Sequence, residues 1–481
     1  DAGNAIVVWS RTDDGTGSFV IQTRRFDVAT GVWSIPAIDL SDNTQDAVTP
    51  QIAMDILGNG IAVWSRIDNG TGKSVIQSRR YDVGTDLWLT TTDLSEPGDP
   101  FFPFLPQVAM DPSGNAIVVW QRTDDTTGKS VIQAKKYDEG TDLWLTTTDL
   151  SDPAENASLP QIAMNASGDA VAVWSKRNNP IGIFTQAKRY DAETDLWLTT
   201  TNLSEPGDFL ALLLGAPQVA MDQTGNAIVI WVRADNIGRF LVQTKRYNAG
   251  TDSWSTPVIN LSDLGAFPQV AMDDAGNGIA VWAGSGGIQA NRYNVATDLW
   301  STTATGLSDS GGDPQIAMDA AGNGIAIWSN GAIRTKFYDV TTDLWAMTAI
   351  DLSGSGELPQ VAMNASGNAV AVWERTDDGT GKSVIQSTFY ANIPLPTGSK
   401  KIIRFPAQAD LVHVIRWNAV SGAVKYRIYL DAYFSNIIAE IPASKNPCFE
   451  YHGRCPGEKV TYYIVAVDEN GNNGIPSSIT I

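Results

Sequence analysis

The sequence predicts an all-β protein built from repeated, four-stranded antiparallel sheets. Eight near-copies of one cassette follow one another along the chain, and they hold fifteen of its sixteen tryptophans. Within each cassette, short segments rich in Val, Ile, Thr, Tyr and Trp are bounded by Gly, Asn, Asp or Pro, a pattern typical of β-strands. No stretch with helical periodicity competes with this pattern.

Each cassette predicts four strands, which we name A to D. In residues 50–95 they read PQIAMD, GIAVW, SVIQSRRYD and LTTTDLS, and a Gly-Asn turn joins A to B. Glycine at Gly58 supplies the positive φ that such a turn requires. One Trp closes strand B in every cassette: Trp9, Trp64, Trp120, Trp174, Trp231, Trp282, Trp328 and Trp373. Another opens strand D in seven: Trp33, Trp88, Trp144, Trp197, Trp254, Trp300 and Trp345.

Units of this length cannot bury both faces of a sheet alone, so neighbouring units must stack. Radial stacking gives a β-propeller, with the Trp side chains packed between sheets. Within it, we expect the repeated strand C glutamines such as Gln77 to hydrogen-bond within or between sheets. The Asp that ends strand A, as at Asp55, is expected to stabilise the turn. Basic pairs such as Arg79-Arg80 are expected on a solvated face.

The step from strand C to strand D resembles part of a kelch repeat. An aromatic residue precedes the Trp by seven positions, followed by Asp or Asn and by Thr, as in residues 81–88. The resemblance covers residues 1–392 and implies an eight-bladed, kelch-like β-propeller with four strands in each blade. The chain departs from the family at the end of strand B, where Val-Trp or Ile-Trp replaces the Gly-Gly pair.

The first and last repeats are incomplete. The chain opens inside an A to B turn, and the last repeat stops after strand C at Tyr390. In one interpretation, strand A lies upstream of Asp1 and residues 393–400 fill the missing outer strand. In the other, a neighbouring copy supplies the missing inner strand and the protein self-associates, because an unpaired sheet edge templates pairing.

Residues 393–400 are predicted to be a linker, and residues 401–481 resemble a fibronectin type III domain. Trp417 and the tyrosines Tyr462 and Tyr463 carry this resemblance, which implies an Ig-like β-sandwich with a tyrosine corner. Cys448 and Cys455 stand in one short loop. We expect them to form a disulfide, because an oxidising compartment favours such a bridge and no further ligands suggest a metal site.

The net charge and the lengths of the apolar runs limit the classes of partner that we expect. The net charge of −20 makes nucleic acid and anionic membranes poor partners, and no apolar run approaches the length of a membrane-spanning helix. We expect a secreted or cell-surface protein that binds a glycan or a surface protein. Its candidate surface is the propeller face that carries the B to C and D to A loops, because those loops vary in length while the opposite turns do not.

The candidate binding residues on this loop face are of two kinds. Two D to A loops are unusually apolar, and acidic pairs recur in the B to C loops. The apolar loops form either a partner site or a plug over the central channel. The acidic pairs read as Asx-type turns, so we expect no cofactor, with calcium as the alternative. The candidates are Phe101, Phe102, Phe104, Phe209, Leu212, Asp13, Asp14, Asp377 and Asp378.

Enzymatic chemistry finds little support in the sequence. The only histidines, His413 and His452, lie outside the repeats, which also lack cysteine. Copper radical oxidases resemble the predicted domain order but need several His ligands and a Tyr-Cys crosslink. Sialidase-like propellers need an arginine cluster and a Tyr/Glu pair, and no repeat breaks the pattern to provide them, as catalytic sites normally do. The sequence therefore predicts a non-catalytic binding or adhesion protein, with a structural subunit of a surface layer or filament as the alternative. A secreted propeller enzyme ranks third.

Overall fold

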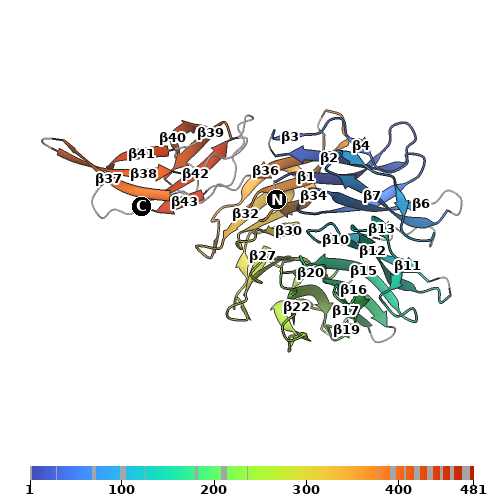
Figure 1. Ribbon diagram of the computed structural model, residues 1–481. Helices are drawn as coiled ribbons and strands as arrows, with labels where there is room; N and C mark the ends of the chain where they lie inside the picture. Colours follow the sequence, from blue (N-terminus) through green and yellow to red (C-terminus); the bar gives the residue numbers. More distant parts are fainter. Residues whose placement is uncertain are drawn as a thin grey trace.

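A computed structural model gives the fold, and its regular elements are β-strands (Figure 1). It describes residues 3–480 except 29, 68–71, 98–104, 125, 179–181, 207–213, 236, 378, 391–396, 406–407, 417–422, 431–436, 445–447, 455–459 and 468–476. Each repeat folds into one antiparallel sheet whose strands pair in chain order, from an inner strand to an outer edge. The prediction of repeated antiparallel sheets is confirmed.

The strands of the repeats are as follows. The first four sheets contain β1 (Ala5–Thr12), β2 (Phe19–Asp27), β3 (Val32–Trp33) and β4 (Ile38–Asp39); β5 (Ala47–Met54), β6 (Gly60–Ile67), β7 (Ser74–Asp82), β8 (Leu87–Trp88) and β9 (Thr92–Asp93); β10 (Gln107–Met110), β11 (Ala116–Thr123), β12 (Ser130–Asp138), β13 (Leu143–Trp144) and β14 (Thr148–Asp149); β15 (Asn156–Met164), β16 (Ala170–Asn178), β17 (Gly182–Asp191), β18 (Leu196–Trp197) and β19 (Thr201–Asn202). The next sheets contain β20 (Gln218–Met221), β21 (Ala227–Ala234), β22 (Phe240–Asn248), β23 (Ser253–Trp254) and β24 (Ile259–Ser262); β25 (Gly265–Met272), β26 (Gly278–Gly284), β27 (Gly287–Asn294), β28 (Leu299–Trp300) and β29 (Thr305–Gly306); β30 (Gly312–Met318), β31 (Gly324–Ser329), β32 (Gly331–Asp339) and β33 (Leu344–Trp345). The last repeat sheet contains β35 (Ala369–Thr376) and β36 (Ser383–Tyr390), and β34 (Ile350–Met363) joins it to the sheet before.

The outer strand differs from the prediction, because strand D is two short strands and not one. In the second sheet, β8 and β9 both pair with β7, through Tyr81↔Trp88 and Gln77↔Asp93, and residues 89–91 between them belong to neither strand. At this break, Leu89 N still donates to the Arg80 carbonyl at 2.7 Å, and the Arg79 side chain donates to the Leu89 carbonyl.

The A to B turn is built as the sequence predicts. Asp55 Oδ1 accepts hydrogen bonds from the backbone N–H groups of Leu57, Gly58 and Asn59 at 2.7–2.9 Å. Gly58 adopts φ 101°, a conformation that costs glycine little. The repeated Asp is therefore a turn residue.

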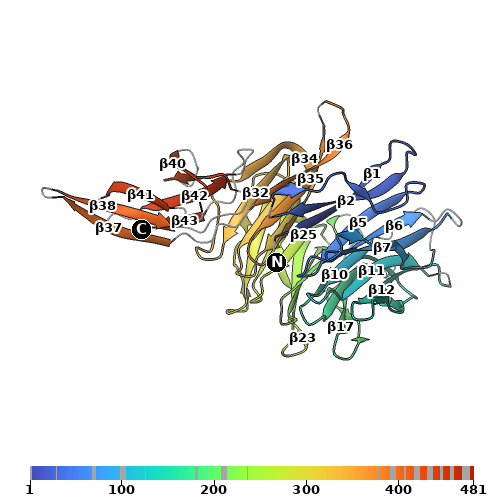
Figure 2. The same ribbon diagram turned by 45° about the horizontal axis from the view of Figure 1, so that its top comes forward.

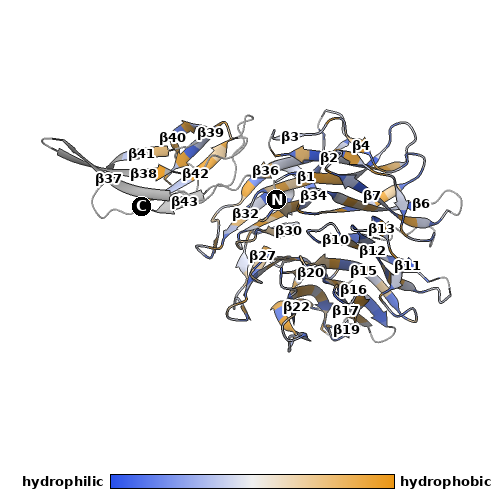
Figure 3. Cartoon of the chain, viewed as in Figure 1, coloured by the Kyte–Doolittle hydropathy of each residue, from blue (hydrophilic) through white to orange (hydrophobic). Residues whose placement is uncertain are grey.

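The core lies between neighbouring sheets (Figure 3). The strand B Trp of each sheet from the second onward is 0–4 % exposed and packs on the sheet before it, as Trp174 packs on Ile132 and Leu150. The predicted Gln contact is also confirmed: Trp64 Nε1 donates to Gln77 Oε1 at 3.1 Å, and Gln77 Nε2 donates to Asp93 Oδ1 at 2.7 Å.

The sheets are arranged radially, as in a β-propeller (Figure 2). Inner strands lie side by side in the order β5, β10, β15, β20, β25, β30 and β34. The first and last repeat sheets also meet: the rings of Phe26 and Phe389 are 4.9 Å apart, and Lys382 Nζ lies 2.9 Å from Asp14 Oδ1. The ring is closed by side chains at this junction.

The C-terminal part forms two further sheets, one of β37 (Thr397–Phe405), β38 (Gln408–Arg416) and β41 (Cys448–Arg454), the other of β40 (Ile437–Pro442), β39 (Lys425–Tyr429), β42 (Thr461–Val467) and β43 (Ser477–Thr480). Ile415 from the first sheet and Tyr462 from the second share one buried cluster. Because residues 397–400 pair with β38, they do not fill the outer edge of the last repeat, and that interpretation is wrong for them. In the described part of the chain, no helix is long and apolar enough to cross a membrane.

Candidate functional site

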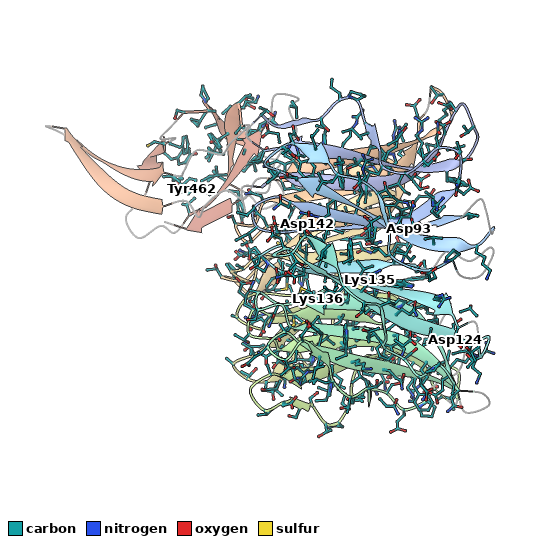
Figure 4. All side chains as sticks on the ribbon, turned by 45° about the vertical axis from the view of Figure 1, so that its right-hand side comes forward. Asp93, Asp124, Lys135, Lys136, Asp142 and Tyr462 are labelled. Carbon is teal, nitrogen blue, oxygen red and sulfur yellow. The ribbon has the colours of Figure 1, made fainter. Side chains whose placement is uncertain are left out.

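A charged contact, the clasp, joins neighbouring sheets on the face that carries the A to B and C to D turns. Lys136, at the end of β12, donates to the hydroxyl of Tyr190 at 2.7 Å and to Asp195 Oδ1 at 2.9 Å in the next sheet. The guanidinium of Arg80 makes the same contact with Asp142 and stacks 4.6 Å from the ring centre of Tyr137. Lys136 and Asp142 are labelled in Figure 4.

The clasp Asp residues occupy a strained backbone position. Asp142 and Asp195 have φ 58° and 56°, in the left-handed region where Asp is tolerated better than most residues. Burial, with the hydrogen bond to the clasp Asp second, raises the pKa of Tyr81 to about 12. This role was not predicted, since the two partners stand about sixty residues apart in the sequence.

The basic pairs on strand C were predicted to form a solvated face that balances neighbouring carboxylates. They do pair with carboxylates, but across the junctions between sheets. The second residue of each pair makes the clasp with the following sheet. The first points back to the preceding sheet: Lys135 Nζ donates to the Leu94 carbonyl at 3.1 Å, and Lys188 Nζ to the Leu150 carbonyl at 3.2 Å. Burial lowers the pKa of Lys135 and of Lys188.

Cavities open beside the clasps on this turn face. The largest, of about 530 Å³, lies between the fourth and fifth sheets and is lined by Asp169, Arg189, Tyr190, Asp191, Glu193 and Tyr247. Equivalent cavities at the two adjoining junctions measure about 200 Å³ and 40 Å³. Only the largest of these three reaches the range of roughly 300–1,000 Å³ typical of small-molecule sites.

The fourth repeat breaks the pattern at this cavity. Neighbouring repeats have Asp at the end of strand A and Asn after the turn Gly, as in Asp111 and Asn115, whereas the fourth has Asn165 and Asp169. The swap keeps the turn bonds, because Asp169 N donates to Asn165 Oδ1 at 2.9 Å and Ala192 N to Asp169 Oδ1 at 3.0 Å. It places a carboxylate at the cavity.

A second and larger opening, the seam cleft, lies between the first and last repeat sheets. It measures about 1180 Å³, and its lining includes Trp9, Arg24 and Trp33 from one side and Val372, Lys382 and Ile385 from the other. Each of the other sheet junctions holds a buried apolar cluster at the same place. The cleft is thus a junction that lacks its core.

The acidic loop residues form the turns that the sequence predicts. Asp13 Oδ1 accepts from Gly15 N, Thr16 N and the Thr16 hydroxyl at 2.8–3.0 Å, and Asp377 makes the same bonds with Gly379 and Thr380. Hydrogen bonds, chiefly from Thr16 and Thr380, lower the pKa of Asp13 and Asp377. Asp14 pairs with Lys382. In the described part of the chain, no three His, Cys, Asp or Glu side chains gather as metal ligands would.

The remaining predicted site residues stay untested. Phe101, Phe102, Phe104, Phe209, Leu212 and Asp378 lie outside the described residues. Cys448 is half-buried and has no disulfide partner among the described residues, but Cys455 lies outside them, so the disulfide remains a prediction.

Comparisons with known proteins find similarity in fold alone. No protein-family model matches the chain, and no curated protein matches it. Among solved structures, a fungal alcohol oxidase of the AA5 family in complex with copper has 12% identity and a TM-score of 0.44, with 90% of this chain and 96% of that chain covered. The α-L-arabinofuranosidase Arb93A from Fusarium graminearum has 10% identity and a TM-score of 0.38, covering 62% and 94%. The Dos1 propeller has 9% identity and a TM-score of 0.46, covering 76% and 92%.

These structures correct the functional prediction. The sequence predicted a non-catalytic binding or structural protein, yet solved structures with a similar arrangement of sheets include glycoside hydrolases and an oxidase. The prediction that the protein is not an enzyme therefore does not stand. At 9–12% identity and TM-scores below 0.5, no reaction is carried over from these enzymes.

Proposed function

We propose that the protein acts on carbohydrate at the turn-face cavity between the fourth and fifth sheets. The swap at Asn165 and Asp169 carries this proposal, because it places a carboxylate in the largest of the three turn-face cavities described above. This proposal places the binding site on the turn face, whereas the sequence predicted the loop face. Unlike that prediction, it also allows for catalysis.

The lining suits a ligand rich in hydroxyl groups. Carboxylates accept hydrogen bonds from sugar hydroxyls, and the Arg189 guanidinium donates them. Asp169 is held by hydrogen bonds from Ala192 and Asn165, whereas Glu193 is exposed at the cavity mouth. A fixed carboxylate beside a movable one favours a second candidate function, hydrolysis of a glycosidic bond, because such hydrolysis uses two carboxylic groups.

A panel of soluble polysaccharides tests both functions, with binding measured by affinity electrophoresis and turnover by release of reducing ends. Asp169→Asn should lower binding at least about tenfold, by loss of a charged hydrogen-bond acceptor. Its melting temperature should not change, since the last repeat already has Asn364 and Asn368 at these positions.

Asn115→Asp, at the smaller neighbouring cavity, is the matched control and should bind normally. Binding that is unchanged in Asp169→Asn, or no binding to any polysaccharide, would refute the proposal. Release of reducing ends that Glu193→Gln abolishes would support hydrolysis, and binding without release would exclude it.

We further propose the finer architecture that the sequence suggests. The repeats then form an eight-bladed, kelch-like propeller over residues 1–392, and residues 401–481 form a fibronectin type III domain with a Cys448–Cys455 disulfide. The support is the repeat pattern, the two C-terminal sheets and their shared cluster. With glycan as ligand, we propose a secreted or cell-surface location.

A further inference from the structure

The seam cleft is a junction between sheets from which one segment is missing. At the other junctions, a crossing segment runs from the outer strands of one sheet to the inner strand of the next. Residues 141–165 are such a segment, reading TDLWLTTTDLSDPAENASLPQIAMN. Among the described residues, the last repeat sheet ends at β36 without outer strands, and the first begins at β1 without an inner strand. Both open edges flank the seam cleft.

We propose that the seam cleft takes up one extended polypeptide segment of this crossing type. The segment pairs with the outer edge of β36 and then with the inner edge of β1. This proposal goes beyond the proposed function, because it concerns a different surface and a different class of ligand. Groups on both walls of the cleft, and one buried hydroxyl beside it, lack the partners that crossing segments provide at the other junctions.

The backbone of Ile385 on β36 is the first such group. At the equivalent Ile132, the backbone N–H donates to the Ser151 hydroxyl at 2.9 Å, and the carbonyl accepts from Leu150 N at 2.8 Å. Ile132 is 0 % exposed beneath Leu150, whereas Ile385 is 38 % exposed. In the described part of the chain, nothing takes the place of this Leu-Ser pair at Ile385.

Arg24 on β2 is the second group. Its equivalents are the first basic residues of the strand C pairs, such as Lys188, which donates to the carbonyl of Leu150 in the crossing segment. Arg24 lines the cleft, and no carbonyl among the described residues accepts from it. A crossing segment bound in the cleft supplies that carbonyl at its Leu.

The hydroxyl of Tyr390 is the third group. Tyr137 donates its hydroxyl to Asp142, the Asp of the T-D-L-W sequence at the start of a crossing segment, at 2.8 Å. Tyr390 is 2 % exposed, and its hydroxyl has no hydrogen-bond partner among the described residues. An Asp supplied at this position accepts a hydrogen bond from the buried hydroxyl and so stabilises the complex.

The charged residues and the side-chain packing of the seam cleft fit a crossing segment such as residues 141–165. Residues 141–165 contain four acidic residues and no Lys or Arg, while Arg11, Arg24 and Lys382 line the cleft. Glu155 of that segment pairs with Lys176, and Arg11 stands at the equivalent position on β1. The half-buried Trp9 lies where Trp174 packs against Leu150.

A second copy of residues 1–481 is a poor donor, because its own crossing segments are held in its sheets. The occupant we infer is therefore a repeat-type segment from outside residues 1–481. A synthetic peptide of residues 141–165 is the probe, added to the chain of residues 1–481. Isothermal titration calorimetry should give one site per chain, and hydrogen exchange should show new protection in β1 and β36. A scrambled peptide should do neither.

Substitutions in the peptide and in the protein test whether binding takes place in the seam cleft. The peptide change Leu150→Asp and the protein change Ile385→Asp should each weaken binding at least about tenfold, because each removes an apolar contact in the cleft. Ile437→Asp on β40 is the matched control, since Ile437 is 47 % exposed and Ile385 is 38 % exposed. The peptide change Asp142→Ala should weaken binding to the wild-type protein and leave binding to Tyr390→Phe unaltered.

Three outcomes would overturn the proposal. They are no binding at millimolar peptide, binding that leaves exchange in β1 and β36 unchanged, and concentration-dependent self-association of the chain that the peptide does not reverse. None of these depends on carbohydrate, so this test and that of the proposed function fail independently.

Discussion

Trp174 and Trp9 occupy the same position in two repeats, and they allow the inter-sheet core to be tested with one kind of substitution. Trp174 is 0 % exposed, packs on Ile132 and Leu150, and donates to Gln186 Oε1 at 2.9 Å. Truncating a buried Trp to Ala costs about 3–5 kcal/mol. Trp9 is half-buried at the open seam, where it belongs to no buried cluster. We expect Trp9→Ala to cost about 1–2 kcal/mol, since less apolar surface is lost from the core.

These free energies convert to shifts in melting temperature. An unfolding entropy of about 2.1 cal/mol/K per residue, over the roughly 390 residues up to the end of β36, gives about 0.8 kcal/mol/K. Trp174→Ala should therefore lower the melting temperature by about 4–6 °C and Trp9→Ala by about 1–2 °C. Scanning calorimetry measures both. Equal shifts for the two variants, or a near-neutral Trp174→Ala, would refute the assignment of the core to the junctions between sheets.

Three further predictions follow from the described contacts. Trp64→Phe should destabilise the protein by about 1 kcal/mol more than Trp120→Phe in urea unfolding. The reason is that Trp64 Nε1 donates to Gln77, whereas Trp120 Nε1 has no partner among the described residues. Equal losses of stability in the two variants would contradict this prediction. The raised pKa of Tyr81 and Tyr293, each about 12, means that the folded state keeps a proton that the unfolded state loses above pH 10, so stability should fall as pH rises from about 10 to about 12. Tyr81→Phe with Tyr293→Phe should flatten this fall in melting temperature, and an unaltered slope would argue against the clasp. Cys448 and Cys455 should resist alkylation without reductant, and two adducts by intact mass would exclude the disulfide.

The local parts of the fold could be predicted from the sequence because they depend on neighbours within one repeat. The alternation of apolar residues defined the strands, Asp55 and Gly58 defined the turn, and the recurring Trp and Gln77 defined the sheet interior. These interactions span at most a few tens of residues, and repetition showed each of them several times over. The break in strand D was missed, because residues 89–93 contain no Gly or Pro that would interrupt a strand.

The candidate sites, in contrast, depend on which faces of neighbouring sheets meet. Arg80 and Asp142 read as separate surface charges until radial stacking brings them together. The swap at Asn165 and Asp169 is visible in the sequence, but only the cavity beside Arg189 and Glu193 gives it a chemical meaning. Likewise, the sequence by itself determined that the first and last repeats lack strands. Only the tertiary structure decided that both open edges face one cleft, because closing the ring brings Asp14 beside Lys382, 368 residues away along the chain.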